Sequence, residues 1–441
     1  MYFWNKKNES SDIFIVSDDA SVSYFEFNVI VNQFTSKFSD SYKRSLAFIV
    51  MDNSIESYAI YIACLKFKII PLLLPNDISK ENIANLCNNF YPSFVYQNNI
   101  DLKKDFSIIK NDELGLLLST SGSTGSSKLV AISYDALQSN TESICSYLKI
   151  SKKDRAFCSM PLSYSYGLSV LNTHFSKGAS VVITNKSPFE PKFIEIFTLN
   201  KCTNISGVPF FHEALLRVGF YKKSYPYLRF ITQAGGHLKD RYKTKIFEYS
   251  TNDNIDFFVM YGQTEATARI SFVPPDKLSE KLSSIGIPIP NGSLSISEEG
   301  EIIYTGPNVM MGYVENFKEI DLLTTKKILH TGDLGYVDND GFFFITGRAK
   351  RYIKIAGYRY SLDEIENLLN INFNCKLLVD GCEDCLEIFS MNTIKQDEIN
   401  TVLKSEFNIN KLNVKFYFVS EFPLNLNGKY DYKKLRDYIC L

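Results

Sequence analysis

The chain has 441 residues, of which 45% are hydrophobic and 22% charged, and its formal net charge at pH 7 is -1. A chain of this length exceeds a single simple core, so we expect two or three domains. The near-zero net charge gives no electrostatic reason for binding nucleic acid or an anionic membrane surface. The composition is that of an ordinary globular protein.

The start of the chain has no continuous apolar stretch after a basic segment, so we expect no signal peptide. The most apolar window, residues 69–75, is far shorter than the roughly 18 residues of a membrane-spanning helix. The cysteines are scattered and odd in number, which is typical of a reducing compartment. We therefore expect a cytoplasmic protein without a membrane span, in which the close pair Cys382 and Cys385 consists of reduced thiols near a surface turn.

Strand-like and helix-like segments alternate through the first three quarters of the chain. Residues 45–51 are typical of a buried strand, and residues 54–67 carry apolar side chains at helical spacing. Other short apolar runs stop at glycine, among them those ending at Gly236 and Gly262. This alternation predicts layers of helices and sheets, an α/β fold. Ligands of such folds bind beyond the carboxyl ends of strands, so the polar segments at these ends are candidate site segments.

The pattern of predicted elements changes after about Pro274. Short strands separated by turn signals predict a β-rich subdomain at about 275–345, with a hairpin that turns at 339–341. The chain then becomes basic, and Ser361 with Glu364 forms a candidate capping box at the start of a helix. We expect a large N-terminal domain at 1–349 and a small α+β domain at 350–441.

A loop of glycine and small hydroxyl residues follows the apolar run that begins at Leu116. Its sequence, STSGSTGSSK at 119–128, combines hydroxyl donors and the charge of Lys128 with backbone amides that glycine lets approach a ligand closely. Such an anion nest suits a polyphosphate, although its spacing is not that of the familiar phosphate loop. The alternative is a flexible linker, which is seldom flanked by apolar strands.

Further motifs occur in a fixed order. They are YGQTEAT at 261–267, HTGDLGY at 330–336, GRAKRYIKIAGYRYSLDEIE at 347–366 and PLNLNGKYDYKKL at 423–435, together with the weaker GVPFFHEAL and QAGGHL. With the loop they resemble the adenylate-forming superfamily, which includes acyl-CoA synthetases, adenylation domains of non-ribosomal peptide synthetases, and luciferases. The resemblance runs from about Ser21 to the end of the chain, and five ordered motifs are highly specific.

The resemblance implies a ligase that joins a carboxylic acid to the α-phosphate of ATP and expels pyrophosphate, with AMP as the leaving group for a second step. Donors and a cation aimed at the phosphate charge should supply the main rate enhancement. The acyl group would pass to a thiol, either of CoA or of a phosphopantetheine carrier protein. The expected cofactors are ATP and Mg²⁺.

By the same resemblance, Thr264 would bind the α-phosphate, Glu265 would hold Mg²⁺, and Lys429 would bridge the acid and the α-phosphate. Tyr261 would stack on adenine, and Asp333 would accept the ribose hydroxyls. The residues expected around ATP are Thr120, Ser121, Gly122, Ser123, Thr124, Gly125, Lys128, Gly235, Gly236, Tyr261, Gly262, Asp333 and Arg348.

The family's small domain swings about a hinge residue, which matches Lys350 here. One orientation would serve adenylation with Lys429, and the other would serve the second step with Lys354, Gly357 and Arg359. The expected walls of the acid pocket include Tyr164, Tyr166, Gly167, Val208, Phe210 and His237.

This chain departs from the family at two places. Ser127 stands where the loop usually has proline, and Tyr164 stands where the family usually has histidine. The segment around Tyr164 also has no Asp to pair an α-amino group, which favours an aryl, fatty or hydroxy acid. The aromatic residues of this pocket are equally typical of a plain core.

Each motif alone has a plainer interpretation. Asp333 could be a turn residue, Glu265 a charge at a helix start, Lys429 a solvated loop lysine, and the basic run at 348–354 a solvated surface. The ordered recurrence of the motifs favours the functional interpretation. The runner-up functions are amino-acid adenylation for a carrier protein or an amine, and a nucleotide-binding protein without turnover. The intact Glu265, Asp333 and Lys429 argue against the latter.

Overall fold

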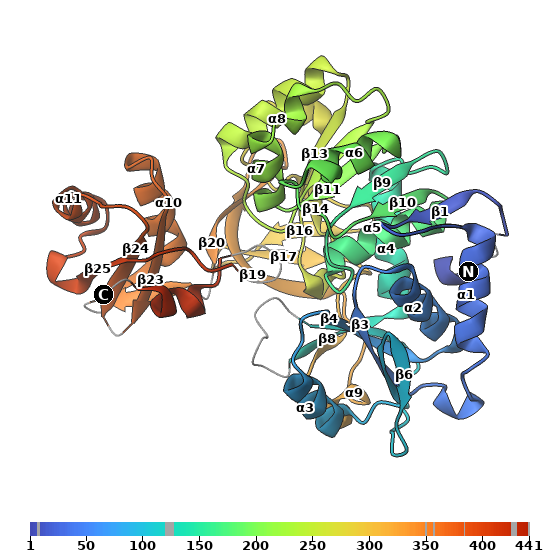
Figure 1. The fold of residues 1–441 in the computed structure, drawn as a ribbon. Coiled ribbons are helices and arrows are strands. Elements are labelled where there is room, and N and C mark those ends of the chain that lie inside the picture. Colours follow the sequence, from blue (N-terminus) through green and yellow to red (C-terminus); the bar gives the residue numbers. More distant parts are fainter. Residues whose placement is uncertain are drawn as a thin grey trace. The chain divides into compact units, whose positions relative to one another are not determined.

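The structure is a computed structural model of the chain, and it describes residues 1–6, 9–119, 128–348, 351–355, 358–382, 384–424 and 430–439. The chain divides into two compact units (Figure 1). Met1–Ser293 and Tyr304–Leu329 form the first unit, and Leu294–Ile303 and His330–Leu441 form the second. The strand that contains His330 therefore belongs to the same unit as the C-terminal part of the chain. The hinge expected at Lys350 lies outside the described residues and stays a prediction.

The larger sheet of the first unit runs in the order β15-β14-β13-β12-β11-β9-β10-β1-β2. Its central strands are parallel, and the strands at both ends pair antiparallel. The strands are β1 (Ile13–Val16), β2 (Ser21–Ser23), β9 (Arg155–Cys158), β10 (Ser180–Ile183), β11 (Asn204–Gly207), β12 (Phe230–Gln233), β13 (Asp256–Tyr261), β14 (Ser271–Val273) and β15 (Ile287–Pro288).

The other sheet of the first unit runs in the order β18-β8-β7-β4-β3-β5-β6. Here β3, β4, β5 and β7 are parallel, while β8, β18 and β6 pair antiparallel with their neighbours. The strands are β3 (Leu46–Met51), β4 (Ile70–Pro75), β5 (Phe94–Gln97), β6 (Asn99–Leu102), β7 (Leu114–Ser119), β8 (Leu129–Ser133) and β18 (Gly312–Val314).

Helices alternate with these strands along the chain, which confirms the α/β class that the sequence predicts. The α-helices are α1 (Tyr24–Thr35), α2 (Ile55–Phe67), α3 (Lys80–Phe90), α4 (Tyr134–Tyr147), α5 (Ser165–Lys177), α6 (Pro191–Leu199), α7 (Pro209–Arg217), α8 (Asp240–Asn252) and α9 (Phe317–Ile320). Short 3-10 helices are η1 (Phe3–Asn5), η2 (Asp40–Tyr42), η3 (Phe220–Lys222), η4 (Thr264–Ala266) and η5 (Pro275–Lys277). In the described parts of the chain, none of the helices combines the length and the apolarity that crossing a membrane requires.

Helix α2 illustrates why these segments fold as expected. Ser54 caps the helix by accepting a hydrogen bond from the Ser57 amide, and the helix ends where Lys68 adopts a left-handed conformation with φ 60°. Most residues of α2 are buried, because the helix is apolar on nearly every face.

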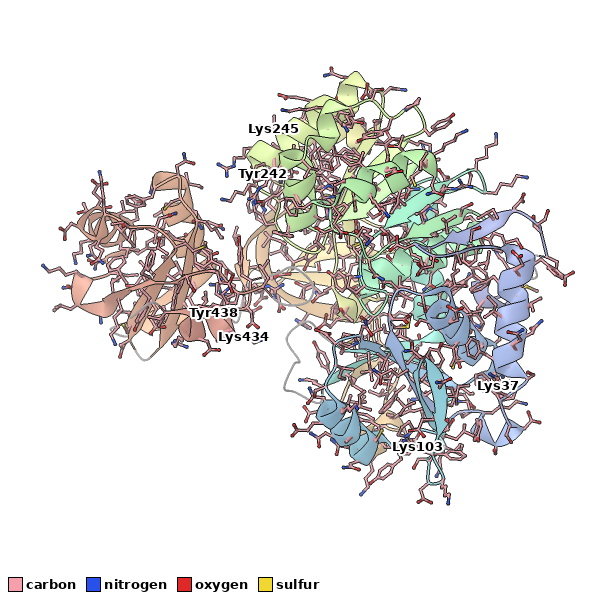
Figure 2. The ribbon with its side chains drawn as sticks, in the orientation of Figure 1. Lys37, Lys103, Tyr242, Lys245, Lys434 and Tyr438 are labelled. Carbon is pink, nitrogen blue, oxygen red and sulfur yellow. The ribbon has the colours of Figure 1, made fainter. Side chains whose placement is uncertain are left out.

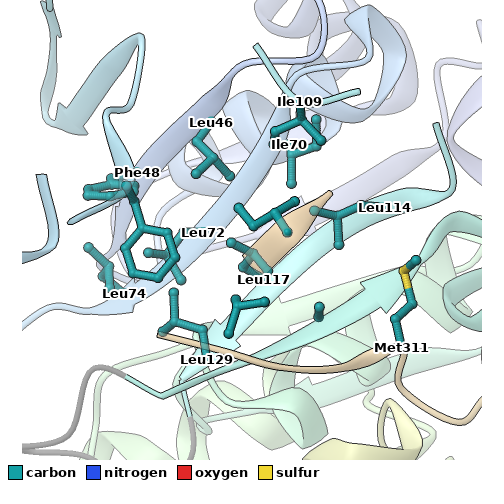
Figure 3. Close-up of a cluster of buried hydrophobic side chains, with 14 of the residues drawn as sticks. Leu46, Phe48, Ile70, Leu72, Leu74, Ile109, Leu114, Leu117, Leu129 and Met311 are labelled. Carbon is teal, nitrogen blue, oxygen red and sulfur yellow. The ribbon is translucent and has the colours of Figure 1, made fainter. Parts of the chain in front are cut away.

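A buried hydrophobic cluster fixes the strands on both sides of the glycine-rich loop (Figure 3). Leu114 and Leu117 of β7 and Leu129 of β8 pack in it with Phe48 and Leu72 of the neighbouring strands. Strands β7 and β8 pair antiparallel, with Ser119 opposite Leu129. The residues just before and just after the segment 120–127 are therefore held on a rigid core, although that segment itself lies outside the described residues.

The second unit contains most of the β16-β17-β19-β20 sheet, the β21-β22 hairpin, and the β23-β24-β25 sheet with two helices. Apolar side chains of α10, α11 and these strands form its core, among them Ile365, Leu369 and Ile388. Ser361 accepts a hydrogen bond from the Glu364 amide at the start of α10, as its capping position predicts. The elements are β16 (Ser293–Ile296), β17 (Glu301–Thr305), β19 (Ile328–Val337), β20 (Phe343–Arg348), β21 (Tyr352–Ile355), β22 (Tyr358–Ser361), α10 (Leu362–Asn372), β23 (Leu377–Cys382), β24 (Cys385–Ser390), α11 (Gln396–Phe407), η6 (Lys411–Asn413), β25 (Val414–Phe418) and η7 (Tyr432–Tyr438).

The segment that follows the predicted catalytic lysine is tied to this core. Helix η7 carries Lys434 and Tyr438, which Figure 2 labels, and the Tyr438 carbonyl accepts a hydrogen bond from the Ser420 amide at 3.1 Å. Leu435 is fully buried against Leu378 and Phe389. The chain on the C-terminal side of residues 425–429 is thus part of the folded body.

Candidate active site

The segments expected to form the site follow neighbouring parallel strands of the larger sheet. In this sheet Gly207, the last residue of β11, lies opposite Gln233, the last residue of β12. Val208, Gly235 and Gly262 therefore follow the carboxyl ends of β11, β12 and β13 at one edge of the sheet. This is the edge at which parallel α/β sheets bind their ligands.

Two glycines at this edge leave no room for a side chain. Gly235 has φ 85°, and a Cβ atom there would lie 2.8 Å from the Tyr164 hydroxyl. At Gly262 a Cβ atom would lie 2.0 Å from the carbonyl oxygen of Ala268. Glycine satisfies both positions, because Gly235 has a positive φ and the backbone of Ala268 fills the space beside Gly262. Both glycines lie at the edge where the motifs imply a nucleotide.

The Glu265 carboxylate contacts Tyr313, a residue of the other sheet. The Tyr313 hydroxyl donates a hydrogen bond of 2.6 Å to Glu265 Oε1, and Lys128 Nζ lies 4.4 Å from the centre of the Tyr313 ring. Strand β18 carries Tyr313 opposite Val130 of β8, so the strand pairing brings the end of the glycine-rich loop toward Glu265. Burial raises the pKa of Tyr313, and the hydrogen bond to Glu265 raises it further, so the phenol stays a donor.

This acidic group fits Mg²⁺ in its usual protein setting. In the described part of the chain, no cluster of three or more His, Cys, Asp or Glu side chains could hold a metal ion by itself. Mg²⁺ is commonly bound by one or two carboxylates together with substrate phosphates rather than by a full protein cage. The Glu265 side chain, which accepts a hydrogen bond from the Tyr313 hydroxyl, offers such a carboxylate.

A tight turn follows Glu265. Thr267 has φ 65° and ψ −47°, and the Ala268 amide donates to the Ala266 carbonyl at 2.7 Å. This is a three-residue γ-turn, which is strained for a β-branched residue. The Ser165 and Thr264 hydroxyls lie 3.5 Å apart just before it. Strain of this kind persists only where the surrounding contacts hold it.

Asn308 provides those contacts. This asparagine is 1% exposed, and its amide nitrogen donates to the carbonyls of Ala266 and Arg269 at 2.8 and 2.9 Å. Its backbone carbonyl accepts from the Thr267 hydroxyl at 2.8 Å, and its side-chain oxygen accepts from Tyr304 at 2.7 Å. Asn308 thus clamps the segment that carries Thr264 and Glu265 from both ends of the turn.

The tyrosines expected in the acid pocket occupy different surroundings. Tyr166 is 2% exposed, and its hydroxyl contacts the Thr232 carbonyl and hydroxyl at 3.1 and 2.8 Å. Tyr164 is half-buried and reaches toward Gly235 together with Val208. Gly167 admits no side chain, because a Cβ atom there would lie 2.4 Å from the Pro161 carbonyl oxygen.

The remaining pocket residues are more exposed. Phe210 is 47% exposed in the first turn of α7, whereas the adjacent Phe211 is buried. His237 is exposed. His212, by contrast, is fully buried between the Tyr221 hydroxyl and the Thr232 carbonyl, and burial lowers its pKa to about 4. A neutral histidine that is hydrogen-bonded through both ring nitrogens has a structural role.

The second unit holds Asp333 and Arg348 on adjacent strands. Asp333 of β19 lies opposite Arg348 of β20, and Arg348 Nε is 2.9 Å from Asp333 Oδ1. The Asp333 side chain is buried, whereas that of Arg348 is 60% exposed. A carboxylate held in this way can accept hydrogen bonds from hydroxyl groups, which is the chemistry that ribose requires.

A second polar network in this unit joins the two segments that flank the predicted hinge and lysine. Arg351 contacts Asp363 and lies 3.3 Å from Glu366 Oε2, and its guanidinium stacks 3.9 Å above the Tyr432 ring. The Tyr432 hydroxyl lies 2.9 Å from both oxygens of Glu366, which also pairs with Lys376 at 3.4 Å. This network links the chain just after residue 350 with the chain just after residue 429.

Several predicted residues fall outside the described residues: Thr120, Ser121, Gly122, Ser123, Thr124, Gly125, Lys350, Gly357 and Lys429. Lys354 and Arg359 lie opposite each other in the β21–β22 ladder.

Sequence reasoning missed Tyr313, Asn308 and Arg269. Asn308 and Tyr313 come from a segment far along the chain, and only strand pairing brings them to Glu265. Arg269 gave one usable signal, since it is a charge placed between the apolar residues Ala268 and Ile270.

Comparisons with known proteins agree with this architecture. The AMP-binding enzyme family model matches residues 96–314. The 2-succinylbenzoate–CoA ligase of Listeria monocytogenes is 26% identical over 331 residues, which cover 73% of this chain and 69% of that protein. The D-alanine–D-alanyl carrier protein ligase of Staphylococcus haemolyticus is 27% identical over 350 residues, covering 73% and 70%.

Among solved structures, the o-succinylbenzoate coenzyme A synthetase MenE of Bacillus subtilis, in complex with ATP and magnesium, has a similar fold. Its TM-score is 0.79 at 22% identity, and the match covers 96% of each chain. The chain therefore contains an AMP-binding enzyme domain at residues 96–314, and the relatives that it resembles are CoA ligases and carrier protein ligases.

Proposed function

We propose that the protein is an AMP-forming acid–thiol ligase. It converts a carboxylic acid into an acyl-adenylate with release of pyrophosphate, and then transfers the acyl group to the thiol of CoA or of a carrier protein. The observation that carries this proposal is the carboxyl edge of the larger sheet, where Gly235 and Gly262 lie at neighbouring strand ends and the Glu265 carboxylate follows Gly262. The names of the relatives, which include a CoA ligase and a carrier protein ligase, support the two candidate acceptors.

The first step needs little covalent chemistry from the protein. An oxygen of the acid carboxylate attacks the α-phosphorus of ATP, a new P–O bond forms, and the bond to pyrophosphate breaks. The carboxylate is already ionised at neutral pH, so no general base is required. The buried His212 is not placed to act as one, because both of its ring nitrogens are hydrogen-bonded within the protein. Catalysis then rests on positioning and on charge stabilisation.

The residues of the first unit would supply that stabilisation. Glu265 would hold Mg²⁺, which supplies positive charge to the phosphates. Thr264 would donate its hydroxyl to the α-phosphate, and the γ-turn that Asn308 clamps would keep both side chains in place. Lys128 and the hydroxyl groups of residues 120–124 would hold the β- and γ-phosphates.

The residues of the second unit would complete the chemistry. Asp333 would accept the ribose hydroxyls beside Arg348, and Lys429 would offset the charge between the acid and the α-phosphate. We further propose that the chain turns at Lys350 between the two steps, so that Lys354, Gly357 and Arg359 serve the transfer to the thiol.

The test is a panel of carboxylic acids in an ATP–pyrophosphate exchange assay, followed by the best acid offered with CoA and with a carrier protein. We expect exchange that requires ATP, Mg²⁺ and one class of acid. Lys429→Ala should lower adenylate formation by about 100-fold or more, because it removes the charge between two anions. Transfer from a preformed acyl-adenylate should remain largely intact in this variant.

Lys434→Ala is the matched control, because Lys434 is an exposed lysine of the same C-terminal segment (Figure 2). It should leave both half-reactions unchanged. Equal loss of both half-reactions in Lys429→Ala would contradict the assigned role of the lysine. A protein that catalyses no exchange with any acid would contradict the proposed function itself.

A further inference from the structure

One cation near the candidate site forms no ion pair with a carboxylate among the described residues. Arg269 follows the Thr267 turn and is 3% exposed. Its guanidinium carbon lies 3.9 Å from the centre of the Tyr166 ring, and Nη1 donates to the Ala268 carbonyl at 3.2 Å. The Nε atom is buried and has no hydrogen-bond partner among the described residues.

The buried cation Lys243, by contrast, has a carboxylate partner within the protein. Lys243 is 2% exposed, but Asp240 lies 2.8 Å from its Nζ atom. Arg269 forms no ion pair with any carboxylate in the parts of the chain that the structure describes. Arginine does not lose its proton in proteins, and a stack on one aromatic ring compensates only part of the loss of hydration. A buried charge in this state indicates an anionic partner that is not part of the chain.

The tyrosines around the guanidinium do not supply that charge. Burial raises the pKa of Tyr164 to about 12, although the charge of Arg269 opposes the rise. Burial also raises the pKa values of Tyr166 and Tyr147, again against the charge of Arg269. All three phenols are therefore neutral near pH 7 and supply no negative charge to the guanidinium.

The neighbours of Arg269 indicate that its anionic partner is part of the acid substrate. Tyr164 and Tyr166 were both expected in the wall of the acid pocket, and Tyr164 reaches to the Gly235 cradle. On the other side, Asn308 holds the Arg269 carbonyl and the Glu265 segment in one hydrogen-bonded unit. The guanidinium thus lies against Tyr166, which was expected to line the acid pocket, and Arg269 is four residues from the proposed Mg²⁺ ligand Glu265 in the sequence.

We propose that Arg269 binds a second carboxylate of the substrate, so that the substrate is a dicarboxylic acid. One carboxylate of this acid is adenylated, while the distal carboxylate pairs with Arg269. This inference rests on the proposed function and narrows its substrate class. The same positive charge repels an α-ammonium group, so amino acids are disfavoured as substrates.

The test compares each diacid with its own neutral analogue. The probes are glutarate, adipate, terephthalate and 2-succinylbenzoate, each next to its monomethyl ester, together with D-alanine, in the pyrophosphate exchange assay. In the unmodified protein, we expect at least one diacid to exceed its ester by about 100-fold in kcat/KM, because the ester leaves the buried cation unpaired. D-alanine should be a poor substrate.

Arg269→Met removes the charge and keeps a side chain of similar length. We expect it to raise the KM of the preferred diacid by about 100-fold while the KM of ATP stays the same, so that the diacid and its ester become equal. Arg269→Lys keeps a charge without the planar fork and should retain part of the preference, which tests the proposal even if Arg269→Met folds poorly. Arg241→Met, at an exposed arginine of α8, is the control and should keep the full preference.

Two results would overturn the assignment: a monocarboxylic or amino acid preferred by the unmodified protein, or a diacid preference that survives in Arg269→Met. Either result leaves the proposed ligase function standing, because an acid is still adenylated. Absence of exchange with every acid would remove the proposed function and this inference together.

Discussion

The amino edge and the carboxyl edge of the larger sheet treat their charges differently. At the amino edge the buried Asp154 pairs with Arg229 at 3.0 Å, and it also accepts from the Ser151 amide and the Thr203 hydroxyl at 2.8 and 3.1 Å. At the carboxyl edge Arg269 has no carboxylate among the described residues, and Glu265 has one phenol. The chain therefore neutralises its own charges where the sheet is only structural. It leaves them available at the edge where we propose that the substrates bind.

The largest expected effect is loss of activity at the carboxyl edge. Glu265→Gln should lower pyrophosphate exchange by about 1,000-fold, because the neutral amide binds Mg²⁺ poorly at the point where phosphate charge develops. The melting temperature should change little. Glu248→Gln, at an exposed residue of α8, should retain full activity. If Glu265→Gln instead lowers the melting temperature and leaves exchange intact, Glu265 belongs to the structural class of charges.

The next effect is loss of stability at the amino edge. Asp154→Asn should lower the free energy of unfolding by about 3 kcal/mol, because it leaves Arg229 without its buried partner. Burial alone would raise the pKa of Asp154, but the hydrogen bonds from Arg229 and Ser151 outweigh it and lower this pKa below its ordinary value of 3.8.

The sign of the pH dependence follows from that shift. The stabilisation by Asp154 is present above its ordinary pKa and is lost as pH falls through the lower pKa of the folded state. Urea unfolding should therefore separate the two proteins at pH 7 and bring them together in strong acid. Asp256→Asn, at an exposed residue of the same edge, is the control. A stability difference that grows on acidification would contradict this assignment.

A smaller effect should separate two buried asparagines. Asn308→Ala removes the clamp on the Thr267 turn, and it should cost about 2 kcal/mol of stability and lower exchange further than the loss of folded protein explains. Asn204→Ala, at the amino end of β11, removes a hydrogen bond between the buried Asn204 and His174 and should affect stability alone. Activity measured well below both melting temperatures tests the difference. Equal activity of the two variants would remove the positioning role of Asn308.

The smallest expected effect concerns Tyr313. Tyr313→Phe removes the hydrogen bond to Glu265 but keeps the ring beneath Lys128, so the Mg²⁺ concentration for half-maximal exchange should shift by about threefold. Tyr227→Phe is matched, because Lys201 lies 5.3 Å from the centre of that ring. It should produce no shift, and a shift of equal size in both variants would point to a general effect of losing a phenol.

Much of the fold could be predicted because local patterns decide it. The apolar runs at 46–51 and 256–261 have a strand's length and form strands, and Ser361 caps its helix as expected. The site segments could be placed at strand ends for the same reason. Their partners could not, since Tyr313 reaches Glu265 through the pairing of β18 with β8, which no local pattern specifies.

The acid pocket shows the same limit at the level of single side chains. Phe210 and Phe211 are equivalent in composition, but the phase of α7 exposes the first and buries the second. Tyr166 was equally consistent with a pocket or a core, and the structure gives it a core hydrogen bond to Thr232 and a face toward Arg269. Side-chain phase and long-range pairing are tertiary properties that one sequence does not specify.

The Arg351, Glu366 and Tyr432 network has a mechanical consequence. Glu366 binds both Arg351, just before β21, and Tyr432, at the start of η7, so these two residues cannot shift independently. A movement at Arg351 would therefore be transmitted through Glu366 to Tyr432. If the proposed turn at Lys350 separates two half-reactions, loss of Glu366 should uncouple them without removing a group that touches substrate.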